Sequence, residues 1–177
     1  MKRKLIFITG GARSGKSRFA LTLADAIEGR KVFLATAEAL DEEMKSRIET
    51  HKKERPSGWV TIEEARDLSK ALMTCNGQFE VILIDCLTVW VSNLLVNDTY
   101  DDSQILKDVN HLISSCRDMK GTVILVANEV GLGIVPANRL ARVFRDTAGK
   151  VNQKIAAVAD DVYLVVAGMS LKLKGGD

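Results

Sequence analysis

Cysteines, excess charge and long apolar runs are all scarce in this sequence. Its three cysteines, Cys75, Cys86 and Cys116, are too few and too scattered for a disulfide framework or a zinc cluster. We expect them to be buried thiols, as in a reducing cytoplasm. The first apolar run, residues 5–8, is too short for the h-region of a signal peptide, and no segment approaches the length of a membrane helix. These absences predict a cytoplasmic protein without a membrane span.

Composition places the chain among ordinary soluble globular proteins, with 46% hydrophobic and 27% charged residues. The formal net charge of +2 gives no electrostatic support for nucleic acid as the main partner. The 177 residues contain no internal repeat, low-complexity segment or linker. We therefore expect one domain, residues 1–177, large enough to bury its own core.

Short apolar runs alternate with amphipathic segments. Strands are predicted at residues 4–9, 31–35, 59–62, 81–85, 122–127 and 162–166, and helices at 16–27, 40–54, 64–73, 87–96, 103–119 and from the N-cap Asn138 to residue 159. The alternation indicates an α/β fold, with a mostly parallel sheet and helices on both faces. In such folds, ligands bind beyond the carboxyl ends of the strands.

The segment from Gly10 to Ser17, GGARSGKS, matches the Walker A phosphate-loop (P-loop) pattern in full. Its glycines let the backbone aim N–H groups at phosphate oxygens, and the following helix N-terminus adds partial positive charge. Lys16 is expected to reach the β- and γ-phosphates, and the Ser17 hydroxyl to ligate Mg²⁺. The alternative is a chance glycine-rich turn, which the apolar strand before the loop and the amphipathic helix after it disfavour. The motif predicts binding of a nucleoside triphosphate.

Asp85 ends the apolar run VILID, the form of a Walker B segment whose carboxylate holds Mg²⁺ directly or through water. Many strands end in aspartate only because aspartate favours turns. Given the phosphate loop, a metal role is the better interpretation.

The chain has only two histidines. His111 lies among polar residues of a predicted surface helix and is expected to face solvent. His51 falls on the same stripe of the 40–54 helix as Leu40, Met44 and Ile48, with arginines close by in sequence. A neutral imidazole can attack phosphorus. Spacing alone nevertheless favours a half-buried structural histidine over a nucleophile.

The segment NEVGLGIVP, residues 128–136, follows a predicted strand, where α/β enzymes place functional loops. The next helix carries Arg139, Arg142 and Arg145, with Asp146 beside the last. These charges suit a solvated stripe as well as a site for a phosphate or an acidic partner surface.

Together these residues closely resemble the bifunctional adenosylcobinamide kinase/adenosylcobinamide-phosphate guanylyltransferase family of cobalamin biosynthesis. The matching segments span the chain in order: 9–17 (TGGARSGKS), 35–37 (ATA), 41–44 (DEEM), 47–48 (RI), 51–52 (HK), 55–56 (RP), Trp59, 85–88 (DCLT), 93–95 (NLL), 128–131 (NEVG), 133–136 (GIVP), 138–142 (NRLAR), 144–146 (FRD) and 151–153 (VNQ). The phosphate loop alone is generic, and the segments around His51 and NEVGLGIVP make the match specific.

The resemblance implies two reactions. ATP or GTP first phosphorylates the hydroxyl of the aminopropanol arm of adenosylcobinamide. GTP then donates GMP to that phosphate through a covalent histidine intermediate, giving adenosylcobinamide-GDP and pyrophosphate. The matching histidine is His51, which the resemblance makes a nucleophile.

The resemblance also implies site residues and an assembly. We expect His51 and Lys16 to be catalytic, and Ser17 and Asp85 to hold Mg²⁺ with GTP or ATP. The expected nucleotide contacts are Gly10, Gly11, Ala12, Arg13, Ser14, Gly15, Lys16, Ser17, Ala35, Thr36, Ala37, Lys52, Lys53, Glu54, Arg55, Glu63 and Asp85. Members of the family are RecA-like P-loop domains that form homotrimers. Their partner is a corrinoid small molecule.

Two other functions fit the phosphate loop. A P-loop kinase of another small metabolite would use Lys16, Ser17 and Asp85 but give His51 no covalent role. A RecA-like ATPase module would bind a partner or DNA and perform no transfer chemistry. The near-neutral charge and the lack of an added domain disfavour the ATPase module.

Overall fold

The computed structural model describes residues 3–38, 42–53, 57–96 and 101–176. Within these ranges the chain forms a seven-stranded sheet in the order β3-β2-β4-β5-β1-β6-β7. The strands are β1 (Leu5–Gly10), β2 (Lys31–Ala35), β3 (Val60–Glu63), β4 (Val81–Asp85), β5 (Thr122–Asn128), β6 (Asp161–Val166) and β7 (Met169–Lys174). Neighbouring strands are parallel except β6 and β7, which form an antiparallel pair.

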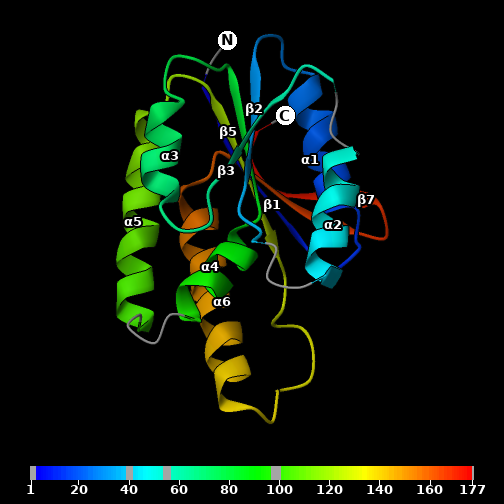
Figure 1. Ribbon diagram of the computed structural model, residues 1–177, viewed down its shortest axis with the longest axis vertical. Helices are drawn as coiled ribbons and strands as arrows, with labels where there is room; N and C mark the ends of the chain where they lie inside the picture. Colours follow the sequence, from blue (N-terminus) through cyan, green and yellow to red (C-terminus); the bar gives the residue numbers. More distant parts are fainter. Residues whose placement is uncertain (1–2, 39–41, 54–56, 97–100, 177) are drawn as a thin grey trace.

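Helices cover both faces of the sheet (Figure 1). On one side lie α1 (Lys16–Asp25) and α2 (Glu42–Lys53), and on the other lie α3 (Leu68–Thr74), α4 (Leu87–Leu95), α5 (Asp102–Asp118) and α6 (Arg139–Val158). The central strands are buried on both faces because their apolar runs supply side chains to two separate clusters. This arrangement confirms the predicted α/β P-loop fold with a mostly parallel sheet.

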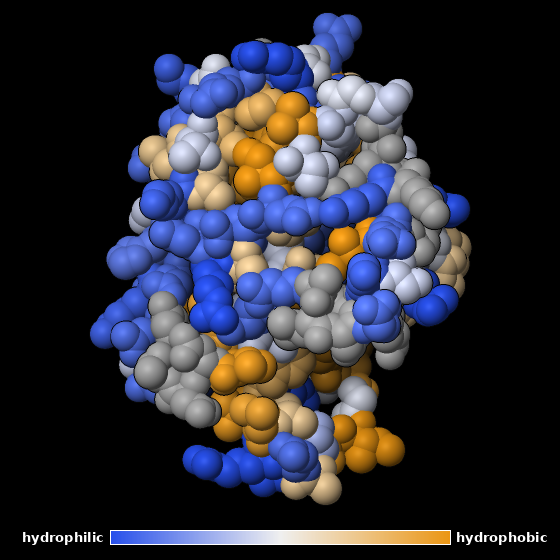
Figure 2. Space-filling model, viewed as in Figure 1, coloured by the Kyte–Doolittle hydropathy of each residue, from blue (hydrophilic) through white to orange (hydrophobic). Residues whose placement is uncertain are grey.

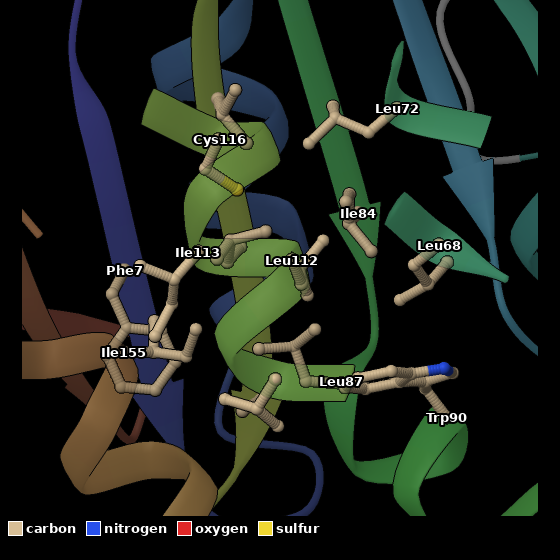
Figure 3. Close-up of a cluster of buried hydrophobic side chains, with 14 of the residues drawn as sticks. Phe7, Leu68, Leu72, Ile84, Leu87, Trp90, Leu112, Ile113, Cys116 and Ile155 are labelled. Carbon is tan, nitrogen blue, oxygen red and sulfur yellow. The ribbon is translucent and has the colours of Figure 1, made fainter. Parts of the chain in front are cut away.

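The larger cluster fixes the position of α4, directly after β4. Side chains of α3, α4 and α5 meet those of β1 and β4 there (Figure 3). Trp90 of α4 is 1% exposed, and its indole N–H donates a 2.8 Å hydrogen bond to the carbonyl of Arg66. The indole thus ties α4 to the segment that follows β3.

The carboxyl ends of the six parallel strands share one edge of the sheet. The last residues of these strands follow the strand order: Glu63 of β3, Ala35 of β2, Asp85 of β4, Asn128 of β5, Gly10 of β1 and Val166 of β6. Some of the predicted functional residues, Ala35, Glu63, Asp85 and the phosphate loop that begins at Gly10, therefore share this edge.

Two elements differ from the predictions. The helix predicted from residue 64 begins at Leu68, because Asp67 is its N-cap and accepts a hydrogen bond from the N–H of Lys70. Residues 169–174, for which no strand was predicted, form β7. The ends predicted for the second helix, Leu40 and Glu54, lie outside the described residues.

Candidate active site

The phosphate loop joins β1 to α1, and its backbone geometry and packing favour glycine at two positions, Gly10 and Gly15. Gly15 is the N-cap of α1 at φ 95°, a left-handed conformation that favours glycine, and Arg13 has φ 55°. A Cβ on Gly10 would overlap the carbonyl oxygen of Val165 and lie 2.7 Å from the Ser14 hydroxyl. The loop closes with a 3.2 Å hydrogen bond from the Ser14 N–H to the Gly11 carbonyl.

Lys16 is held inside this loop. It is 8% exposed, and its ammonium donates a 3.2 Å hydrogen bond to the Gly11 carbonyl. The Ser14 hydroxyl is also buried and makes no hydrogen bond within the described part of the chain. The loop therefore presents a lysine ammonium and a buried hydroxyl at the N-terminus of α1.

The β6–β7 turn supports the loop from the other side. The N–H of Gly168 donates a 2.8 Å hydrogen bond to the Ser14 carbonyl. Ala167 and Gly168, at φ 51° and 81°, make the tight turn that brings this N–H to the loop. No feature assigned from the sequence indicated this contact.

Asp85 is the last residue of β4, and the thiol of the next residue, Cys86, is buried. Burial raises the pKa of the adjacent Cys86 thiol to about 12, the Asp85 carboxylate adds to the rise, and the Lys16 charge opposes it.

Thr36 follows β2 and links it to the end of β4. Its fully buried hydroxyl donates to the Cys86 carbonyl at 2.9 Å and accepts from the Cys86 N–H at 2.8 Å. The Asn93 side chain donates to the Thr36 carbonyl at 2.8 Å. Thr36 was an expected nucleotide contact, but its side chain is hydrogen-bonded to the backbone of Cys86. Ala37, the next expected contact, is half-buried.

Asn128 and Glu129 lie between the phosphate loop and Asp85, because β5 separates β1 from β4. Asn128 is opposite Gly10 in the sheet, and the Glu129 N–H donates a 2.9 Å hydrogen bond to the Gly10 carbonyl. The Glu129 carboxylate accepts a 2.6 Å hydrogen bond from the N–H of Gly131.

Helix α2 carries the second group of expected site residues. His51 and Lys53 fall in its last turn, and only their backbone is described. Lys52 forms a 2.5 Å ion pair with Glu63 at the end of β3, and both side chains are exposed. Glu54 and Arg55 lie outside the described residues. The structure therefore joins two expected nucleotide contacts, Lys52 and Glu63, to each other.

The segment after β5 exposes apolar side chains. Leu132 is 87% exposed and Ile134 is 96% exposed. Figure 2 shows apolar side chains gathered at the lower end of the molecule, where the β5–α6 segment and the start of α6 lie. Arg142 donates hydrogen bonds to the carbonyls of Pro136 and Ala137, while Arg145 pairs with Asp146 at 2.9 Å. These two arginines are thus committed to local contacts.

Three minor expectations, on His111, the cysteines and Asn138, are confirmed. His111 is exposed, and all three cysteines are buried free thiols. Asn138 is the N-cap of α6, accepting from the N–H groups of Leu140 and Ala141. No helix in the described ranges is long and apolar enough to cross a membrane.

The known proteins that this chain resembles are enzymes of cobalamin biosynthesis. The family model described as cobinamide kinase/cobinamide phosphate guanyltransferase matches residues 6–173. The bifunctional adenosylcobalamin biosynthesis protein CobU of Escherichia coli is 42% identical over 181 residues, covering 96% of this chain and 99% of its own. The protein of the same name from Salmonella typhimurium is 44% identical, with the same coverage. CobP of Pseudomonas aeruginosa, also named a bifunctional adenosylcobalamin biosynthesis protein, is 44% identical over 95% of this chain and 96% of its own.

These matches confirm the expected activities, a kinase and a guanylyltransferase of cobalamin biosynthesis. Four of the segments that carried the resemblance, 9–17, 35–37, 85–88 and 128–131, include the carboxyl ends of β1, β2, β4 and β5, which are neighbours in the sheet. The chain belongs to the cobinamide kinase/cobinamide phosphate guanyltransferase family.

Proposed function

We propose that residues 1–177 act as a single catalytic domain that performs two successive transfers. ATP or GTP phosphorylates the hydroxyl on the aminopropanol arm of adenosylcobinamide, and GTP then donates GMP to the new phosphate. The products of the second transfer are adenosylcobinamide-GDP and pyrophosphate. The observation that carries this proposal is the buried Lys16 ammonium held within a phosphate loop of a chain from this family.

The residues from Gly10 to Ser17 grip the nucleotide phosphates in both transfers. The Lys16 ammonium moves from the Gly11 carbonyl to the phosphate oxygens, which are stronger acceptors because they are ionised. A phosphate oxygen also supplies a partner for the Ser14 hydroxyl, which has none among the described residues. Loop amides and the α1 N-terminus then stabilise the negative charge of the transferred group.

His51 is the nucleophile of the guanylyl transfer in this proposal. Its neutral imidazole nitrogen attacks the α-phosphorus of GTP, an N–P bond forms, the bond to the bridging oxygen breaks, and pyrophosphate leaves. The substrate's phosphate oxygen then attacks the same phosphorus and displaces the imidazole. The support is the family resemblance around residues 51–56, together with the location of His51 on α2.

The remaining nucleotide contacts are Ala35, Thr36 and Ala37 after β2, Lys52, Lys53, Glu54 and Arg55 after His51, and Glu63 and Asp85 at strand ends. Lys52 can exchange its exposed partner Glu63 for a phosphate at small cost, because exposed ion pairs contribute roughly 0–1 kcal/mol.

We assign a magnesium ion to Ser17 and Asp85. A hydroxyl and a carboxylate are the hard oxygen donors that Mg²⁺ prefers, with nucleotide phosphates and water completing its shell. Among the described residues, no group of three or more potential metal ligands occurs, which fits a metal held mainly through the nucleotide. When bound, the ion neutralises charge on the phosphates.

We also propose a cytoplasmic homotrimer with a corrinoid substrate and no nucleic-acid partner. Buried free thiols suit a reducing compartment. Exposed Leu132 and Ile134, and Met169 at 72% exposure, are apolar surfaces of the kind that neighbouring subunits or a large ligand cover. The segment between β5 and Asp146 is where we place the corrinoid.

The experiment is a coupled assay with purified protein, adenosylcobinamide, ATP, GTP and Mg²⁺, with products identified by mass spectrometry. We expect the phosphate and then the GDP derivative. Lys16→Ala should lose both activities, because each transfer needs the phosphates held. Full kinase activity in that variant contradicts the proposed function of the loop.

A further inference from the structure

We propose that Glu129 is the general base of the kinase step. Its carboxylate accepts the proton of the attacking hydroxyl as that hydroxyl bonds to the γ-phosphorus. This inference rests on the proposed function, which requires a hydroxyl acceptor in the first transfer. It adds a catalytic role to a residue that the sequence had placed only within a functional segment.

Glu129 lies beside the phosphate loop. It follows β5, the strand adjacent to β1, and its N–H donates to the carbonyl of Gly10 at 2.9 Å. The Lys16 ammonium, which would bind the β- and γ-phosphates, ends at the carbonyl of the next residue, Gly11, at 3.2 Å. Glu129 therefore lies beside the part of the loop that would hold the transferred phosphoryl group.

The Glu129 carboxylate is oriented by its own turn. The side chain is half-buried, and one carboxylate oxygen accepts a 2.6 Å hydrogen bond from the Gly131 N–H. Within the described residues, no other hydrogen bond to this carboxylate occurs. One oxygen thus fixes the side chain, and the other is available to a substrate hydroxyl.

Other carboxylates along this edge are less well placed. Asp85 is on β4, two strands from β1, a separation of roughly 10 Å at the usual strand spacing. Glu63 is on β3, farther along the edge, and pairs with Lys52. Glu64 accepts hydrogen bonds from the N–H groups of Arg66 and Asp67 ahead of α3. Of these acids, Glu129 is the one that directly follows a strand adjacent to β1, the strand that leads into the phosphate loop.

The two transfers differ in whether they need a general base. In the kinase step an O–H bond breaks, the oxygen forms a bond to the γ-phosphorus, and the nucleoside diphosphate leaves, so one proton must be accepted. In the guanylyl transfer, a neutral imidazole attacks first. A phosphate monoester, largely ionised at neutral pH, attacks second. A base is therefore required for the first transfer alone.

The test compares Glu129→Gln with the wild-type protein in separate assays. Glutamine keeps an oxygen that accepts from Gly131 but is not a base. We expect kcat of the kinase step to fall about 100-fold or more, and label transfer from GTP to the protein, and from the protein to preformed adenosylcobinamide-phosphate, to stay within about threefold. Glu28→Gln, an exposed change in the loop that follows α1, is the matched control and should leave both transfers unchanged.

Two results overturn the proposal. One is a kinase kcat in Glu129→Gln within about tenfold of wild type. The other is an equal fall in both transfers, which would make Glu129 a support of the loop. Protein labelling reports whether the variant folds, and Glu129→Asp, which keeps a displaced carboxylate, should retain more kinase activity than Glu129→Gln. If the wild-type protein phosphorylates no adenosylcobinamide, the proposed function itself fails, and that result is seen before any variant is made.

Discussion

The backbone N–H of Gly168 donates a 2.8 Å hydrogen bond to the carbonyl of Ser14, which joins the turn of the C-terminal hairpin to the phosphate loop. The two residues are far apart in sequence, and β6 pairs with β1 directly beside them. The hairpin is therefore part of the framework that holds the loop in shape.

Gly168→Ala tests this relationship. Gly168 has φ 81°, and a left-handed conformation costs a residue with a Cβ roughly 1–2 kcal/mol, although an added Cβ meets no atom within 4 Å. We expect a lower free energy of unfolding and a higher KM for GTP. Gly176→Ala, also with open space around its Cβ, is the control. An unchanged KM in a destabilised Gly168→Ala protein would limit the turn to a structural role.

Two glycines of the phosphate loop should respond differently to the same change. A Cβ on Gly10 overlaps the Val165 carbonyl, whereas a Cβ on Gly11 has nothing within 4 Å. We expect Gly10→Ala to lower the free energy of unfolding by about 1–3 kcal/mol and to weaken nucleotide binding. Gly11→Ala should change stability by less than about 0.5 kcal/mol. Chemical denaturation and nucleotide titration measure both effects, and equal stability of the two variants would contradict the close approach of the Val165 carbonyl to Gly10.

The variant Lys52→Ala tests whether Lys52 contacts GTP or only pairs with Glu63. Its pair with Glu63 is exposed at both ends, so Lys52→Ala should alter the free energy of unfolding by less than about 1 kcal/mol. If Lys52 contacts GTP, the same variant should label poorly with GTP. Lys45→Ala, which removes another exposed ion pair of α2, is the control. Normal labelling of Lys52→Ala would remove this residue from the nucleotide site.

Asp161 should make stability depend on acid pH. Burial alone would raise the pKa of this carboxyl, but hydrogen bonds and charges from Lys4 and Lys172 outweigh it and hold the pKa below its ordinary value of 3.8. The stabilisation is present above pH 3.8 and is lost as pH falls through the lower folded pKa. We expect the free energy of unfolding of Asp161→Asn to be about 1–2 kcal/mol lower than that of the wild-type protein at neutral pH. The difference should shrink as the pH falls below 3.8. Denaturation at a series of pH values checks this, and a constant difference would show that the carboxyl's charge is not involved.

Much of the fold was predictable because its strongest signals are local. Continuous apolar runs marked β1, β4 and β5, and Asn138 marked the start of α6. Strand β7 was missed because its alternating Leu and Lys side chains are exposed and its turn begins with Ala167, which is not a typical left-handed residue. The strand order, which places β5 between β1 and β4, depends on contacts far apart in sequence.

The phosphate loop was the predictable part of the site, because the Walker A motif adopts one characteristic backbone geometry. The loop from Gly10 to Ser17 has the expected course, but the Gly168 contact needs tertiary structure. Thr36 matched a family segment, whereas its hydroxyl binds Cys86 backbone, a bond no pattern reveals. Glu129 was only one polar residue of a segment until β5 was placed beside the phosphate loop.

The most direct test of a covalent histidine uses GTP labelled at its α-phosphorus. Wild-type protein incubated with this GTP and Mg²⁺ should carry a label that is acid-labile and base-stable, as a phosphoramidate is, while GTP labelled at the γ-phosphorus should leave none. His51→Ala should carry no label, with its far-UV circular dichroism unchanged. Label that survives in His51→Ala, or no label on the wild-type protein, would contradict the account.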